Sequence, residues 1–339
     1  MEKQRHIESL DGLRGVAALA VVFTHLPLIF PQSPYLARMT AGGEAVSLFF
    51  SLSGFLMAYL YGGKPFSQGA ALDYLLHRFA RIYPIYFVAV VFTALVSLLP
   101  YHFPALLLGA KEIARHLTML GSTGVFWSIP PEIQFYFLFL LLWFWFDRPV
   151  SRAFIGLAIA AAFVFDWILG FPGPGILLPS KMEYFLMGAV AGRLFGLLPF
   201  RRHGTVVGVA ALLAVILHFV LYKVFLDGDI YWGMTSALSA TVAVTLVAFN
   251  APPSAALLSS RPLRFLGRIS FSLYLFHMPV MFLLSLVLPT AIPMIAQVGL
   301  CVGLSIAFAT MTFQAIERPA RQAILSIATR KCAPTQVAA

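Results

Sequence analysis

Charged side chains are scarce in this chain of 339 residues. Asp, Glu, Lys and Arg make up 11% of it, whereas a soluble globular domain usually carries about 25%. Hydrophobic residues make up 60%, and apolar stretches long enough to cross about 30 Å of hydrocarbon recur along the whole length. The polar breaks between them are short. The composition excludes an ordinary soluble protein and leaves little room for a separate soluble domain.

Cysteine and ligand-binding motifs are also nearly missing. The two cysteines are Cys301, within an apolar stretch, and Cys332, near the C-terminus, and they support neither a disulfide framework nor a metal site. We find no Gly-rich nucleotide loop and no repeat of about 20–50 residues. We therefore expect no metal and no permanently bound cofactor, so that a nucleotide-containing molecule would act only as a co-substrate.

The apolar stretches predict about ten transmembrane helices. They cover residues 12–30, 45–61, 82–99, 131–146, 154–170, 182–198, 206–225, 233–250, 271–288 and 295–314. The first is followed by several prolines rather than by a small-residue cleavage site, so we expect it to remain in the mature protein. The expected fold class is all-α and polytopic, with one transmembrane domain over residues 1–325 and a short disordered cytoplasmic tail over residues 326–339.

Lys and Arg are unequally distributed between the two sides of these helices. If the N-terminus is cytoplasmic, eighteen of the 23 Lys and Arg residues fall on the cytoplasmic side and five on the other. Basic residues in short loops are retained in the cytoplasm, so both termini are predicted to be cytoplasmic. This bias explains the net charge of +10 without nucleic acid, and it favours contact with anionic membrane lipid or an anionic cytosolic substrate.

Two ionisable residues share one face of the first apolar helix. Arg14 and His25 are eleven residues apart in LDGLRGVAALAVVFTH, which on a helix brings them within about 20° of one direction and separates them by about 16 Å. A lone membrane histidine can simply bond a neighbouring helix. The cation on the same face, with Asp11 one turn before it, favours a functional role instead.

A second basic pair lies at the start of the third predicted helix, in HRFARIYPIYF. Arg78 and Arg81 are three residues apart and so share a helix face. They could anchor the helix against lipid headgroups. The alternative is that they join Arg14 in a clamp for phosphate, whose oxygens guanidinium groups bind bidentately.

The segment GSTGVFWSIPPEIQFYF carries the third polar group. Trp127 and Ser128 precede two prolines, and Glu132 opens an apolar helix that has Tyr136 one turn further on. Serine, proline and a carboxylate are common at helix N-termini, which is one interpretation. In the other, Glu132 lies toward the outer side and either orients His25 or binds an acceptor hydroxyl.

The fourth group lies in ISFSLYLFHMPV. Tyr274 and His277 precede Pro279, which frees a backbone carbonyl one turn upstream. Local repair of that kink is one explanation, and a supporting role in a polar site is the other. Together the four groups predict a basic entrance on the cytoplasmic side, which leads to a histidine at mid-membrane. This arrangement suits a group carried on a phosphate-bearing cytosolic donor, with acyl-coenzyme A as the obvious candidate.

A transporter or flippase for a glycan or acyl donor is the alternative, because polar residues lining a helix bundle also describe a translocation path. Paired discontinuous helices in two related halves would support it, and we find no such halves.

Six ordered blocks of the sequence resemble the integral-membrane acyltransferases of acyltransferase family 3. They are LDGLRGVAALAVVFTH, FFSLSGFL, HRFARIYPIY, FWSIPPEIQFY, ISFSLYLFHMP and the closing IERP at 316–319. The resemblance implies ten core helices and transfer of an acyl group, usually acetyl, from cytoplasmic acyl-coenzyme A to a hydroxyl of a cell-surface glycan. It implies a place in the bacterial inner membrane and an acceptor such as an exopolysaccharide, an O-antigen or a secreted oligosaccharide.

The resemblance also implies roles for the residues above. His25 and Glu132 would be catalytic, and Arg14, Arg78 and Arg81 would bind acyl-coenzyme A. The supporting residues would be Asp11, Trp127, Ser128, Tyr136, Tyr274 and His277. Some family members carry an extra span and a periplasmic hydrolase-like domain, and this sequence shows neither. We expect any step that requires such a domain to fall to a separate periplasmic or polysaccharide-assembly protein.

Two mechanisms fit this set. In the first, His25 acts as general base on the acceptor hydroxyl while a donor group stabilises the oxyanion; in the second, His25 is itself acylated and passes the group outward.

Overall fold

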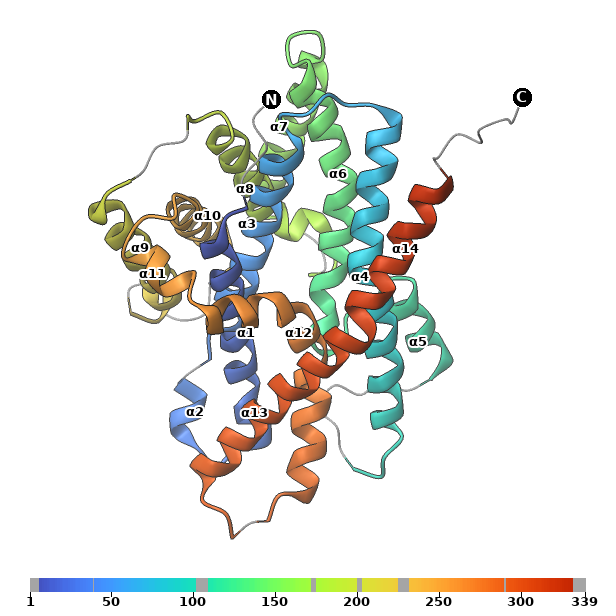
Figure 1. Ribbon diagram of the computed structural model, residues 1–339, viewed down its shortest axis with the longest axis vertical. Helices are drawn as coiled ribbons and strands as arrows, with labels where there is room; N and C mark the ends of the chain where they lie inside the picture. The colour runs from blue at the N-terminus through green and yellow to red at the C-terminus, as the bar shows by residue number, and fades with distance from the viewer. Residues whose placement is uncertain are drawn as a thin grey trace.

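The computed structural model describes residues 6–38, 40–101, 109–171, 175–199, 203–224, 232–289 and 291–331. Within these ranges the chain forms helices and no β-strand (Figure 1). The all-α prediction is confirmed.

Each of the ten apolar stretches forms a helix. These are α1 (Glu8–Ile29), α3 (Gly42–Tyr61), α4 (Gln68–Ser97), α6 (Ile129–Asp147), α7 (Ala153–Ile168), α8 (Met182–Phe195), α9 (Thr205–Val224), α10 (Met234–Ala248), α12 (Arg261–Val287) and α13 (Met294–Thr312). The shorter elements are α2 (Pro34–Arg38), α5 (Ala110–Leu117), η1 (Gly124–Ser128), η2 (Leu178–Lys181), α11 (Ser254–Leu258), the π-helical turn η3 (Phe313–Glu317) and α14 (Arg318–Lys331).

Six helical segments are long and apolar enough to cross a membrane: α1, α3, α4, α6 with the preceding η1, α12, and α13 with its continuation. The apolar helices α7, α9 and α10 are shorter, and α8 has 14 residues. The protein is therefore a multi-pass membrane protein, while the number of ten crossings stays a prediction.

Two helices begin well before their predicted starts. The third predicted helix begins at Gln68 rather than at residue 82, and the ninth begins at Arg261 rather than at residue 271. Ser67 caps the earlier start of α4, because its hydroxyl accepts a hydrogen bond from the backbone N–H of Ala70. The added turns are polar or amphipathic, so hydropathy alone misses them.

The tail differs from its prediction. It was expected to be disordered from residue 326, but α14 continues through Lys331. Residues 332–339 lie outside the described part of the chain.

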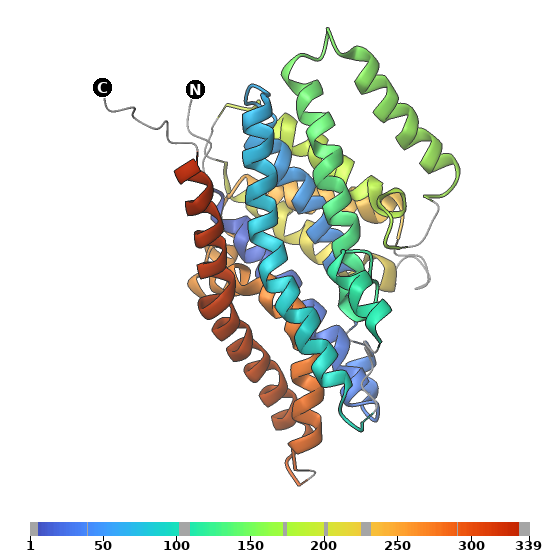
Figure 2. The ribbon, with the colours of Figure 1, turned by 90° about the vertical axis from the view of Figure 1, so that its right-hand side faces the viewer.

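Several of the turns lie at two opposite ends of the molecule. The α3–α4 turn, the α6–α7 turn and the C-terminal end of α14 lie at the top of Figure 1, and α2 lies at the bottom (Figures 1 and 2). This matches a topology in which residues 62–81, 147–153 and the C-terminal region share one side. The assignment of that side to the cytoplasm remains a prediction.

Close helix contacts hold the centre of the bundle together. A side chain at Gly54 on α3 would overlap the backbone of Phe185 on α8, and a side chain at Gly267 on α12 would overlap the backbone of Asp11 on α1. Small residues allow such approach between membrane helices. The second contact places α12 along α1, which puts Ser270 beside Arg14.

Candidate functional site

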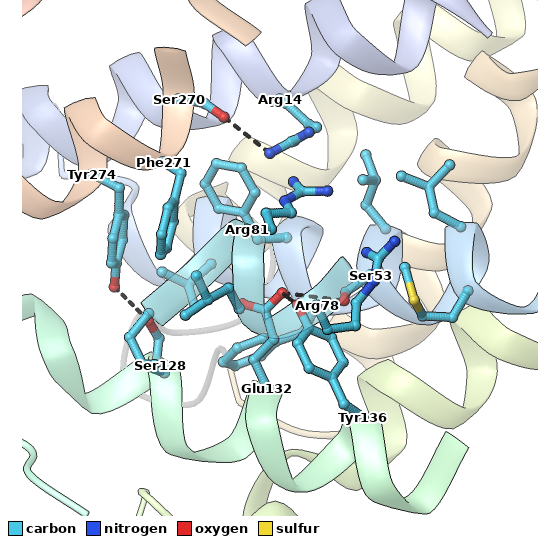
Figure 3. A pocket seen from close by; sticks show the side chains of 18 residues that line it. Arg14, Ser53, Arg78, Arg81, Ser128, Glu132, Tyr136, Ser270, Phe271 and Tyr274 are labelled. Atoms are coloured by element: carbon cyan, nitrogen blue, oxygen red, sulfur yellow. Dashed lines mark hydrogen bonds between the residues drawn. The ribbon is translucent and has the colours of Figure 1, made fainter. Parts of the chain in front are cut away.

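A cavity lies between α1, α3, α4, α6 and α12 (Figure 3). The space between its atoms, including the part open to solvent, is about 690 Å³, and 18 residues line it. Seven of the eleven residues singled out in the sequence are among them: Arg14, Arg78, Arg81, Ser128, Glu132, Tyr136 and Tyr274. Residues from four of the five elements that form the walls were therefore predicted to act together, although they are distant in the sequence.

The basic part of the cavity is formed by three arginines from two helices. Arg14 donates a hydrogen bond to the Ser270 hydroxyl, with 3.2 Å between Nη2 and Oγ. Arg78 is only 8% exposed, and its guanidinium carbon lies 5.7 Å from the centre of the Tyr74 ring. Among the described residues, none of the three arginines lies within 4.0 Å of a carboxylate oxygen.

Buried charges are normally paired, because taking a lone charge out of water is costly. Three guanidinium groups that converge on a cavity without a bound carboxylate therefore form a site suited to a multivalent anion. The two arginines of α4 lie inside the helix rather than before its predicted start at residue 82. Because α4 begins at Gln68, Arg78 lies about 15 Å along the helix from its start.

Glu132 faces the same cavity as the arginines. The Tyr136 hydroxyl donates to its Oε1 at 2.6 Å, and the Ser53 hydroxyl donates to the same oxygen at 3.3 Å. Glu132 also interacts electrostatically with Arg14. The expectation that Glu132 orients His25 is wrong, because none of the hydrogen bonds of His25 reaches Glu132. The first turn of α6 directs this carboxylate toward α3 and α4 instead.

His25 lies outside the cavity wall and contacts His277. The Nδ1 atom of His25 lies 2.8 Å from the Val21 carbonyl oxygen and 3.1 Å from Nε2 of His277. The two ring centres are 4.9 Å apart. The structure thus pairs the predicted catalytic residue with a predicted supporting residue from a helix that is distant in the sequence.

Tyr274 connects the cavity to this histidine pair. Its ring lines the cavity, and its hydroxyl donates to the Val125 carbonyl oxygen at 2.8 Å and lies 2.8 Å from the Ser128 hydroxyl oxygen. Its backbone carbonyl accepts a hydrogen bond from Nδ1 of His277 at 2.9 Å. The middle turns of α12 therefore extend from the basic cavity to His25.

Besides His277, two more of the predicted supporting residues, Asp11 and Trp127, do not line the cavity. The Asp11 carboxylate bonds His6 at 2.8 Å, and it interacts with Arg14 only electrostatically. Trp127 packs edge-on against Phe50 and Trp232, with ring centres 6.1 and 5.6 Å away. Asp11 and Trp127 therefore lie around the cavity rather than in its wall.

Glu317 is a polar residue that the site prediction missed. It is 9% exposed, it accepts a hydrogen bond from the Ser272 hydroxyl at 2.5 Å, and it interacts electrostatically with Arg81 and Arg14. It ends the π-helical turn η3, and such turns occur frequently at functional sites. The signal was present in the IERP block, where one carboxylate interrupts an apolar helix.

Arg321 was also missed, although it is close in space to the same cluster. It lies one turn beyond Glu317 on α14 and interacts electrostatically with Arg81, Arg78 and Glu317. Figures 1 and 2 show α14 running beside α4, which carries the two cavity arginines. The cationic character of this region therefore extends beyond the three residues in the cavity wall.

The remaining cavity wall is apolar. The residues that form it are Val46, Phe49, Phe50, Leu52, Leu56, Met57, Ile82, Ile129 and Phe271. Among the described residues, no three His, Cys, Asp or Glu side chains are grouped as metal ligands would be. The cavity can accordingly hold a molecule with anionic groups at one part and an apolar or neutral chain at another.

Comparison with known proteins places this arrangement in a family. A family model described as an acyltransferase domain matches residues 7–313. The peptidoglycan O-acetyltransferase OatA of Listeria monocytogenes is 26% identical, over 94% of this chain and 56% of its own length. The putative peptidoglycan O-acetyltransferase YrhL of Bacillus subtilis shows the same identity and coverage.

The acyltransferase MdmB of Streptomyces mycarofaciens is 31% identical over 47% of this chain and 45% of its own length. No solved structure matches the chain. The chain spans about half the length of the two peptidoglycan O-acetyltransferases. The family match contains every predicted site residue and five of the six sequence blocks. The chain therefore belongs to the family of membrane proteins that carry this acyltransferase domain.

Proposed function

We propose that the protein is a membrane O-acyltransferase that moves an acyl group, most simply acetyl, from acyl-coenzyme A to a hydroxyl of a glycan. The single observation that carries this proposal is the cavity in which Arg14, Arg78 and Arg81 converge without an ion pair to any described residue, joined through Tyr274 to the His25–His277 pair. The names of the two related peptidoglycan O-acetyltransferases support acetyl as the group and a glycan as the acceptor class.

The donor site is assigned to the arginine-lined cavity. Coenzyme A carries several phosphate groups at one end and a thioester at the other, joined by a long and mostly neutral arm. Guanidinium groups bind phosphate bidentately, and the apolar wall suits the arm. Arg14 and His25 lie about 16 Å apart along α1, so phosphates held by the arginines would leave the thioester free to approach the histidine pair.

The chemistry is assigned to His25. As a general base, it takes the proton of the acceptor hydroxyl while the oxygen attacks the thioester carbonyl carbon; the C–S bond then breaks, and the proton passes to the sulfur of coenzyme A. As a nucleophile, it forms an acyl-imidazole with loss of coenzyme A, and the acceptor hydroxyl then attacks that intermediate. Both routes give the same ester and free coenzyme A.

The proposed location is the bacterial cytoplasmic membrane, with the arginine-lined cavity reached from the cytoplasm. The acceptor would be a cell-surface or secreted glycan on the other side. A separate periplasmic or polysaccharide-assembly protein is the proposed partner for any later step.

The direct test is acyl transfer in isolated membranes. Radiolabelled acetyl-coenzyme A is incubated with a panel of glycans that includes peptidoglycan fragments, using wild type, His25→Ala, Arg14→Ala and the control Arg148→Ala at matched expression. Arg148 is exposed in the α6–α7 turn, away from the cavity.

We expect label in the glycan with wild type and the control, weak labelling with Arg14→Ala, and none with His25→Ala. Equal labelling by His25→Ala would contradict the assignment of the reactive group. Absence of both glycan labelling and coenzyme A binding would remove the donor and favour a transporter.

A further inference from the structure

The contact between His25 and His277 defines where the protons of both rings lie. Hydrogen positions follow from the partners of each nitrogen, since a carbonyl oxygen can only accept a hydrogen bond. Nδ1 of His277 lies 3.1 Å from the Leu273 carbonyl oxygen and 2.9 Å from that of Tyr274. This nitrogen must therefore carry the proton, which leaves Nε2 of a neutral His277 as an acceptor.

The same reasoning applies to His25. Its Nδ1 faces the carbonyl oxygen of Val21 and the bare Nε2 of His277, and both are acceptors. The proton of His25 therefore lies on Nδ1 and is shared between these two partners. Nε2 of His25 keeps its lone pair, and it has no hydrogen bond to any described residue.

We infer that His277 is a positioning residue that holds His25 in the tautomer whose Nε2 is free to react. This inference rests on the proposed acyl transfer, and it applies to both mechanisms, because Nε2 is the base in one and the nucleophile in the other. The hydrogen bond between the two histidines can also persist during the reaction. When Nε2 takes a proton, Nδ1 still donates to His277, so neither ring needs to turn.

His277 is well placed for this task. It is completely buried, and its ring is fixed by two carbonyl oxygens of its own helix while it contacts α1. On its own helix, the His25 ring bonds the Val21 carbonyl one turn back. His277 on α12 adds a second partner, which fixes the plane of the ring.

Repair of the proline kink does not explain the geometry. Pro279 has no N–H, so the carbonyl that loses its helical partner is that of Leu275. The side chain of His277 bonds the carbonyls of Leu273 and Tyr274 instead. Its orientation therefore serves the contact with His25 rather than the freed carbonyl.

The test compares two substitutions that differ in one property. In His277→Gln the amide oxygen extends about as far as Nε2 and can accept the Nδ1–H of His25, whereas His277→Leu fills the space without an acceptor. We expect His277→Gln to keep most of the wild-type kcat. His277→Leu should lose about 10- to 100-fold in kcat, by analogy with the loss found when a partner that orients a metal-binding histidine is removed, with the KM for acetyl-coenzyme A unchanged. His203→Gln is the control, because His203 lies outside the site.

Two results would overturn the inference. One is that both variants keep the wild-type kcat. The other is that both lose kcat equally, which would indicate a packing role. If wild type transfers no acyl group at all, the proposed function fails, and the tautomer is then measured directly.

That measurement is nitrogen-15 NMR of histidine-labelled wild-type protein in membranes, with the His25 signals assigned from a His25→Gln sample. The inference requires a protonated Nδ1 and a bare Nε2 at His25 in the neutral state. A protonated Nε2 with a bare Nδ1 would refute it, independently of activity and of how well any His277 variant folds.

Discussion

Replacing Arg81 by alanine should have opposite effects on donor binding and on the stability of the free protein. Arg81 lines the cavity, it has no carboxylate within 4.0 Å among the described residues, and it is repelled by Arg14 and Arg321 while Glu317 attracts it. An arginine that stabilises a fold normally does so through a bonded carboxylate. Arg81 instead adds positive charge to a region where positive charge is already in excess.

The expected size of the binding effect follows from one lost charged hydrogen-bonding contact. A hydrogen bond to a charged group contributes about 1.5–3 kcal/mol, and each 1.4 kcal/mol corresponds to about tenfold in affinity. The Kd for coenzyme A should thus rise by about 10- to 150-fold. The unfolding temperature without ligand should stay level or rise, because repulsion is relieved.

The assay is thermal unfolding of the detergent-purified protein at increasing coenzyme A concentration. Wild type should show a rising unfolding temperature with ligand, as expected when only the folded state binds. Arg81→Ala should show the rise only at much higher concentration, and Arg81→Lys should fall between them because lysine keeps the charge but loses bidentate geometry. A variant that unfolds earlier without ligand yet binds coenzyme A normally would refute the reasoning and make Arg81 a structural residue.

Three further outcomes are expected. Glu317→Gln removes a negative charge close to Arg14 and Arg81, so coenzyme A should bind several-fold more tightly in the same unfolding assay; weaker binding would show that the carboxylate orients the arginines. Tyr136→Phe removes the 2.6 Å hydrogen bond to the Glu132 carboxylate and should cost about 1.5–3 kcal/mol of stability, seen as earlier unfolding, whereas an unchanged unfolding temperature would contradict this. Gly267→Leu should separate α12 from α1, and both unfolding temperature and acyl transfer should fall; wild-type behaviour would argue against the close contact.

The sequence predicted the helices well because their apolar stretches are determined locally. All ten expected segments are helical, and errors occur where polar turns extend a helix. The start of α4 at Gln68 is the example with the largest consequence, since it places Arg78 and Arg81 well inside the helix rather than before its start, in the wall of the cavity. Hydropathy cannot predict this, because the extra turns are stabilised by a cap and by packing rather than by their composition.

The pairing of site residues was only partly predictable. The four polar groups were recognised as candidates from their cost in a membrane, and residues from all four do lie together. Their partners depend on tertiary packing: His25 and His277 are 252 positions apart, and Glu132 bonds Tyr136 and Ser53 rather than His25. Glu317 was missed because its position depends on the π-helical turn before it.

In the proposed reaction, a donor at the arginine-lined cavity supplies an acyl group, which His25 transfers to an acceptor. Purified protein in sealed vesicles tests it most directly, with labelled acetyl-coenzyme A added on one side and a glycan acceptor enclosed on the other. We predict that enclosed glycan becomes labelled with wild type and with Arg148→Ala, and remains unlabelled with His25→Ala. Labelling at the wild-type rate by His25→Ala would contradict the proposed reaction.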